Sequence, residues 1–266
     1  MHTDPILFEQ RGHIALLTLN RPDTRNALSG EAMFAAFEDL FERLNADMQI
    51  RAAVLTGAGS AFCSGGNVAE MRDRAGMFAG SPEQIAANYR AGIQRIPRAF
   101  QALQVPIIAA VNGPAIGAGN DLACMCDIRI ASSTARFAES FVKVGIVPGD
   151  GGCWLLPRVV GGSKAAELAF TGDSIDADEA LRIGLVSKVV APEALLDAAL
   201  ALAGRIAVNP PQVLRWTKQL LQQARTRTLD EALDTAGDLQ GQAHHTADHA
   251  EAVAAFFEKR APVFGG

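Results

Sequence analysis

The sequence predicts an α/β domain followed by a group of helices. From residue 14 to about residue 190, short apolar runs typical of buried strands alternate with helical patterns. From about residue 200, prolines separate three or four amphipathic helices. With 266 residues, 49% of them hydrophobic, the chain can bury one substantial core and carry an appendage. We therefore expect residues 1–199 to form the core and residues 200–266 a helical subdomain.

The elements of the core follow from the spacing of apolar residues. A helix is expected from Ser29, which fits an N-cap, to about residue 48, because apolar residues recur there at helical spacing. The segment 72–82 mixes charge, glycine, methionine and proline without periodicity, which predicts a mobile loop or lid. Four runs of strand length are expected to build the sheet: 14–20, 52–56, 107–111 and 127–131.

Composition excludes several classes of function. A net charge of −5 argues against general binding to nucleic acids or membrane surfaces. No run approaches the ~18 apolar residues of a membrane span. No secretory leader is evident, and the four cysteines form no Cys-x-x-Cys pair, so a cytoplasmic protein is expected. His244, His245 and His249 include an i, i+4 pair but lie among polar residues of a late helix without a third ligand, and no metal site is expected.

The most informative stretch, residues 112–123, follows the apolar run that ends at Val111. Its Asn-Gly-Pro start predicts a turn, and Asp121-Leu122-Ala123 lies in the opening of a helix. The first N–H groups of a helix are unpaired and lie at the positive end of its dipole. This stretch therefore predicts a site that stabilises developing negative charge, with the carboxylate of Asp121 three residues beyond the donor Ala118.

A second small-residue loop and two further carboxylates complete the candidate chemistry. Gly65-Gly66-Asn67 follows a strand, as the first loop does, and two N–H groups converging on one carbonyl oxygen form an oxyanion hole. Asp150 and Glu139 lie in later segments and would suit proton transfer if burial tunes their pKa values. Taken singly, each feature also fits a tight turn or a charge that complements a helix dipole.

Several motifs in a fixed order give the chain a resemblance to the crotonase, or enoyl-CoA hydratase/isomerase, superfamily. The resemblance covers nearly the whole length. The motifs are Leu19-Asn20-Arg21-Pro22, Arg25-Asn26-Ala27-Leu28, Ala61-Phe62-Cys63-Ser64-Gly65-Gly66-Asn67, the stretch 112–127, Gly145-Ile146-Val147-Pro148-Gly149-Asp150-Gly151-Gly152, Leu156-Pro157-Arg158, Phe170-Thr171-Gly172, Gly184-Leu185-Val186 and Ala255-Phe256-Phe257-Glu258-Lys259-Arg260.

The resemblance implies a crotonase-like spiral of repeated strand-strand-helix units and a C-terminal helical subdomain that mediates trimers or hexamers. It implies an acyl-CoA substrate, with coenzyme A as part of that substrate and no separate cofactor. The oxyanion donors would be the N–H groups of Gly66 and Ala118. Lys259 would reach the nucleotide phosphate, in its own or a neighbouring subunit. The remaining positions that the resemblance places around coenzyme A and the acyl group are Arg25, Ala27, Leu28, Ala61, Ser64, Gly65, Asn67 and Phe141.

The chain departs from the family pattern at both catalytic carboxylates. Hydratases of this family carry glutamate at two positions, but here the first is Asp121 and the second aligns with Phe141. Asp150 lies one position after the place where some isomerase relatives carry an acid, and Glu139 is a further candidate. We expect an enzyme that adds water to a 2-enoyl-CoA. The alternatives are isomerisation of the double bond and a non-catalytic acyl-CoA-binding or RNA-binding role.

Overall fold

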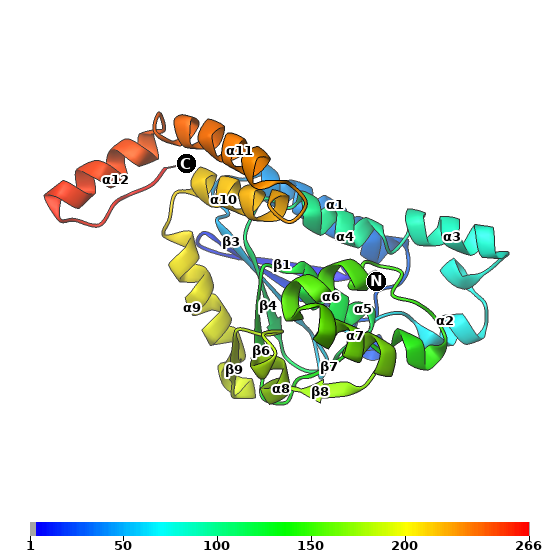
Figure 1. Cartoon of the computed structure of the whole chain (residues 1–266). Coiled ribbons are helices and arrows are strands. Elements are labelled where there is room, and N and C mark those ends of the chain that lie inside the picture. The colour runs from blue at the N-terminus through cyan, green and yellow to red at the C-terminus, as the bar shows by residue number, and fades with distance from the viewer. Residues whose placement is uncertain (1–3, 266) are drawn as a thin grey trace.

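The computed structural model describes residues 4–265 and has two β-sheets surrounded by helices (Figure 1). The larger sheet has six strands in the order β1-β2-β3-β4-β6-β9, and only β1 and β2 run antiparallel. The smaller sheet has the order β5-β7-β8. The strands are β1 (Ile6–Arg11), β2 (Ile14–Leu19), β3 (Ala52–Gly57), β4 (Ile107–Val111), β5 (Ala115–Ile116), β6 (Ile128–Ser132), β7 (Arg136–Ala138), β8 (Ser174–Asp176) and β9 (Lys188–Val190).

The central strands are apolar on both faces because helices cover both sides of the sheet. All five residues of β4 are buried, as expected of a parallel strand inside an α/β protein. On one face, helices α1 (Glu31–Ala46) and α4 (Arg95–Ala102) pack through Phe37, Phe41 and Phe100, whose rings contact one another. On the other face, α9 (Leu195–Ala207) lays its alanines against the sheet. The prediction of an α/β core is confirmed.

The remaining helices follow the two sheets and then leave them. They are α2 (Val68–Arg72), α3 (Pro82–Ala91), α5 (Ala118–Met125), α6 (Gly152–Val160), α7 (Gly162–Thr171), α8 (Ala177–Arg182), α10 (Pro211–Gln223), α11 (Leu229–Ala243) and α12 (Ala247–Glu258). Short 3₁₀ turns lie at Pro22–Thr24, Gly76–Phe78, Ser140–Val144 and Pro192–Ala194. In Figure 1, α11 and α12 extend away from the sheets, at the opposite end of the molecule from α2 and α3. Among residues 4–265, no helix is long and apolar enough to cross a membrane.

Two expectations about boundaries need correction. The break expected between residues 199 and 200 falls inside α9, and α9 belongs to the core because Ala199 and Ala203 are fully buried against the large sheet. The helical appendage therefore begins after α9. Ser29 is not the N-cap of α1, since Gly30 holds that position without a side-chain cap and Ser29 is buried.

Buried cations attach the start of the appendage to the core. The guanidinium of Arg215 on α10 donates to the backbone oxygens of Leu44 and Asp47 at 3.1 and 2.8 Å. The Nζ of Lys218 donates to the Val105 oxygen at 2.9 Å and forms an ion pair with Asp127 at 2.8 Å. These contacts fix α10 beside the C-terminal end of α1, where the backbone oxygens would otherwise lack partners.

Candidate active site

The two small-residue loops lie side by side. Cys63 pairs with Ala115 as an isolated parallel bridge, and the N–H of Ile116 donates to the Cys63 oxygen at 3.0 Å. Glycine is required at the contact, because a Cβ on Gly119 would lie 2.1 Å from the Cys63 oxygen. A Cβ on Gly65 would likewise lie 2.5 Å from the Ile116 oxygen. The close backbone approach explains why the sequence has small residues in both loops.

The N–H groups of Gly66 and Ala118 are the two donors predicted for an oxyanion. Neither donates a hydrogen bond to any group within residues 4–265. Ala118 is the first residue of α5, whose positive dipole end lies there, and Gly117 before it has φ 55° and ψ −122°, a conformation that only glycine adopts readily. A Cβ on Gly65 would lie 3.1 Å from the Ala118 nitrogen, which places the two donor loops in direct contact.

Three carboxyl groups converge beside these loops. Asp121 lies in the first turns of the fully buried α5, Glu139 follows β7, and Asp150 precedes α6. Each is at most 2% exposed. A Cβ built on Gly152 would lie 2.3 Å from Glu139 Oε1 and 2.5 Å from both carboxylate oxygens of Asp121. The absence of a side chain at Gly152 therefore makes room for the carboxyl cluster formed by Asp121, Glu139 and Asp150.

Burial sets the protonation of the carboxyl cluster. Burial raises the pKa of Asp121 well above its usual range, and the charges of Asp150 and Glu139 raise it further. Burial also raises the pKa of Glu139 to about 7, against hydrogen bonds from Asn120, whose Nδ2 donates to Oε2 at 3.0 Å, and from Asp121. Burial raises the pKa of Asp150, against the hydrogen bond from Asp121. All three pKa values are therefore raised, and Asp121 is the group whose pKa is raised by the charges of both its neighbours.

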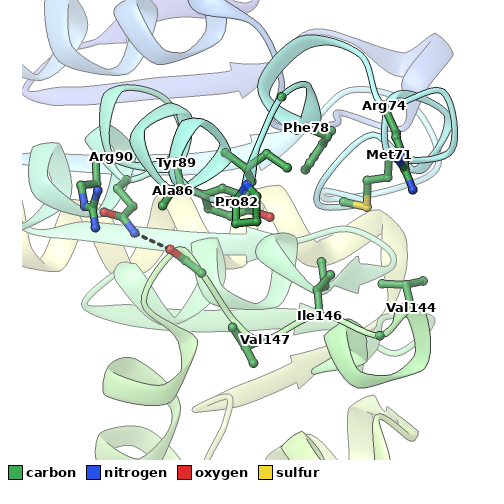
Figure 2. Close-up of a pocket in the computed structure, with 15 residues that line it drawn as sticks. Met71, Arg74, Phe78, Pro82, Ala86, Tyr89, Arg90, Val144, Ile146 and Val147 are labelled. Atoms are coloured by element: carbon green, nitrogen blue, oxygen red, sulfur yellow. Dashed lines mark hydrogen bonds between the residues drawn. The ribbon is translucent and has the colours of Figure 1, made fainter.

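An apolar groove of about 860 Å³ lies between α2, α3 and the segment 144–149, next to the loop that carries Asp150 (Figure 2). Met71 and Phe78 line it and lie next to Gly66, since a Cβ on Gly66 would be 2.9 Å from Met71 Cε and 4.0 Å from Phe78 Cζ. Tyr89 lines it further along and contacts Gly149, the neighbour of Asp150. The groove therefore reaches residues that contact Gly66 and the residue before Asp150.

Helix α3 and the residue Gln94 that follows it contribute further groove residues. Gln94, which follows α3, donates from Nε2 to the Gly149 oxygen at 2.8 Å, the contact drawn in Figure 2. This bond fixes the loop that carries Asp150. Burial and the charge of Asp150 raise the pKa of Tyr89.

Phe141 stands where the resemblance expects a second glutamate. It lies in the 3₁₀ turn Ser140–Val144, and its ring atoms Cζ and Cε1 would be 3.8 and 3.9 Å from a Cβ on Gly117. Phe141 is half-buried and packs against the apolar core. The structure therefore places an aromatic ring beside Gly117 at this position, while Glu139 and Asp150 supply the additional carboxyl groups.

Most of the residues expected around coenzyme A contribute to the site through packing or through backbone hydrogen bonds. Ala27, Leu28 and Ala61 are almost fully buried, and the Leu28 N–H donates to the Gly65 oxygen at 2.8 Å. Arg25 is exposed in a left-handed conformation. Asn67 caps α2 by accepting from the N–H groups of residues 69 and 70.

Two backbone contacts tie the segment that carries Arg25 to the loop 61–67. The N–H of Ser64 donates to the Arg25 oxygen at 2.9 Å. The hydroxyl of Ser64 donates to the Thr24 oxygen at 3.0 Å. The segment around Arg25 and the first donor loop therefore form one connected surface.

Lys259 is not brought to this site within one chain. It is the C-cap of α12, and Figure 1 shows α12 at the end of the molecule opposite α2. The helical appendage points away from the groove, and the role predicted for this lysine at coenzyme A stays a prediction.

Comparison with known proteins agrees with this geometry. A family model described as enoyl-CoA hydratase/isomerase matches residues 9–266. The chain belongs to the enoyl-CoA hydratase/isomerase family. Among its relatives in this family, the short-chain-enoyl-CoA hydratase of Clostridium acetobutylicum is 38% identical, over 98% of this chain and 97% of that protein. The 1,2-epoxyphenylacetyl-CoA isomerase of Escherichia coli K12 is 39% identical, over 95% of each chain.

A solved structure of the family superimposes closely. The crystal structure of the enoyl-CoA hydratase from Bacillus anthracis has a TM-score of 0.90 and 32% identity, and the match covers 98% of each chain. The resemblance inferred from the motifs and the predicted fold class are both confirmed.

Proposed function

We propose that this family member adds water reversibly across the double bond of a 2-enoyl-CoA thioester. The observation that carries the proposal is the placement of the carboxyl cluster beside two unused backbone N–H groups. Addition of water to such a thioester needs three things at once: a base for the water, an acid for C2, and donors for the enolate oxygen. The cluster and the two loops supply all three within one site.

The protonation of the cluster suggests a role for each acid. The thioester oxygen accepts hydrogen bonds from the N–H groups of Gly66 and Ala118, and one such donor can be worth about 3 kcal/mol in the transition state. The carboxylate of Asp150 takes a proton from water as the water oxygen bonds to C3. The carboxyl group of Asp121 gives its proton to C2. Return of the proton from Asp150 to Asp121 then restores the starting state.

Asp150 is the better candidate for the base because of the side it occupies. Asp150 lines a cavity of about 170 Å³ that shares Gln94 and Gly149 with the acyl groove, whereas Glu139 lines a different cavity of about 170 Å³ with residues of α6 and α7. Glu139 therefore lies on the side of Asp121 that faces away from the acyl groove. There it accepts a hydrogen bond from Asp121 and influences which acid holds the proton.

Double-bond isomerisation is the second candidate, and Phe141 favours it. With an aromatic ring where a second glutamate is expected, water has one fewer polar partner near the start of α5. An isomerase would need one carboxylate to remove a proton and to return it two carbons away, with the same donors holding the enolate. The relative from E. coli is named an isomerase, although of an epoxide thioester.

One experiment separates these functions. The purified protein is incubated with 2-enoyl- and 3-enoyl-CoA thioesters, and the products are resolved by mass. A gain of one water supports the hydratase, and an isobaric product with a moved double bond supports the isomerase. Asp121→Asn should abolish either reaction and keep acyl-CoA binding, while Asp39→Asn on the exposed face of α1 should change neither. Absence of turnover on every thioester would refute both proposals in favour of a binding protein.

We also propose that the chain assembles as a trimer or a dimer of trimers through its helical appendage. Leu229 on α11 and Phe256 and Phe257 on α12 are 74–79% exposed, an arrangement that a partner surface would cover. In such an assembly Lys259 would serve a neighbouring subunit's coenzyme A. Sedimentation velocity tests the assembly, and a monomer at micromolar concentration would refute it. A cytoplasmic location, and a reaction without a separate cofactor, stay predictions.

A further inference from the structure

The acyl groove carries positive charge in an acidic protein. Its lining contains two ionised side chains, Arg74 and Arg90, and no aspartate or glutamate. The chain as a whole has a net charge of −5. An apolar groove with guanidinium groups and no acid favours a ligand that is largely apolar and carries an anion.

The two arginines lie at different distances from the thioester position. Arg74 is three residues beyond Met71, which contacts Gly66, so Arg74 belongs to the end where the thioester oxygen would sit. Arg90 follows Tyr89, which contacts Gly149, and therefore belongs to the other end. Figure 2 shows Arg74 and Met71 together on one side of the groove and Arg90 on the opposite side, beyond Tyr89 and Ala86. An acyl chain that starts at Gly66 and passes Asp150 runs toward Arg90.

Arg90 is available for a ligand, unlike its neighbours. Arg95 forms ion pairs with Glu31 and Glu38, and Arg98 donates to the Gln94 side chain at 3.3 Å. The guanidinium of Arg90 makes no ion pair or hydrogen bond with another part of residues 4–265. It is exposed at the groove, so a bound acyl group would cover it and exclude water from it.

We propose that Arg90 binds a carboxylate at the far end of the acyl group, so that the preferred substrate is an acyl-CoA whose chain ends in a second carboxylate. This inference rests on the proposed function for the identity of the thioester. Arginine is suited to the task because its planar guanidinium can hold a carboxylate through two parallel hydrogen bonds.

The test measures binding, so it does not depend on turnover. Isothermal titration compares hexanoyl-CoA with adipyl-CoA, two saturated thioesters of equal chain length that differ in the terminal carboxylate. Eight- and ten-carbon pairs extend the series to find the length that reaches Arg90. At that length the wild type should bind the carboxylated thioester about tenfold more tightly, since hydrogen bonds to a charged partner are worth roughly 1.5–3 kcal/mol. Arg90→Met should remove this preference and leave binding of the methyl-ended thioester within about twofold.

Arg74→Met is the matched control, because Arg74 lines the same groove at the thioester end. It should change the binding of both members of a pair by the same factor. If no pair shows a preference for the carboxylate, or if Arg90→Met weakens both members equally, the assignment is overturned. A preference that disappears in Arg74→Met and not in Arg90→Met also overturns it. Failure of the proposed reaction would appear separately, as intact selective binding without turnover of the unsaturated thioesters.

Discussion

The substitution Gly152→Ala should disable the site while leaving the fold in place. The added Cβ would lie 2.3 Å from Glu139 Oε1 and 2.5 Å from both oxygens of Asp121. An ordinary contact at this atom is 3.4 Å or more, so the carboxyl groups must move by about 1 Å. A displacement of about 1 Å in catalytic geometry can cost roughly 100-fold in rate. We expect kcat/KM to fall by about that factor.

The cost in stability should be smaller. Overpacking a buried site costs about 1–3 kcal/mol, and alanine is about 1 kcal/mol better than glycine inside a helix. Because Gly152 is the first residue of α6, the net loss should be about 1–2 kcal/mol. The protein should remain folded at room temperature and should still bind acyl-CoA.

Gly162→Ala is the control for this substitution. Gly162 is also the first residue of a helix, α7, and nothing lies within 4 Å of a Cβ built there. The assay measures initial rates on a 2-enoyl-CoA together with chemical unfolding of both variants. If Gly152→Ala kept its rate within about threefold of the wild type, the packing of the carboxyl cluster around Gly152 would not be what positions the acids.

Two further predictions concern pH and the donor loops. The pKa of Glu139 is about 7 in the folded protein and 4.5 in the reference state. Between these pH values the folded protein keeps a proton that the unfolded chain releases. The free energy of unfolding therefore falls as pH rises from 4.5 through 7. In Glu139→Gln the fall in the free energy of unfolding between pH 5 and pH 8, measured by calorimetry, should be about 3 kcal/mol smaller than in the wild type. The same pH dependence in the wild type and the variant would contradict this prediction. Asn26→Ala should cost about 3 kcal/mol and lower kcat, because its Nδ2 donates to the oxygens of Ala58, Ala61 and Phe62 at 2.9, 2.9 and 3.2 Å. A variant with unchanged unfolding and full activity would show that the loop 58–66 does not need this amide.

The pattern of apolar residues determined most of the fold. Short apolar runs that alternate with helical patterns indicated an α/β core from the sequence alone. In the structure, alternation along β2 and β3 sends Leu17 and Leu55 to the face covered by α1, and Leu16 and Val54 to the face covered by α9. The sequence could not indicate where the core ends. The alanines of α9 have the same spacing as those of a surface helix, and only their burial against the sheet shows that this helix belongs to the core.

The candidate site was likewise predictable from the sequence only in part. Small residues that allow close backbone contact are visible in the sequence, which is why the loops with Gly66 and Ala118 could be predicted as oxyanion donors. The sequence also pointed to Asp121, Asp150 and Glu139 as separate candidates, but could not choose between the last two.

Only the tertiary structure decided how these acids relate to one another. A pKa depends on burial and on neighbouring charges, and neither is fixed by sequence spacing. The fold brings three segments around Gly152 and buries their carboxyl groups together, with Asp150 next to the groove and Glu139 on the far side. The sequence therefore determined which chemical groups are present, and the packing of α5, α6 and β7 decided how deeply they are buried and which of them lie together.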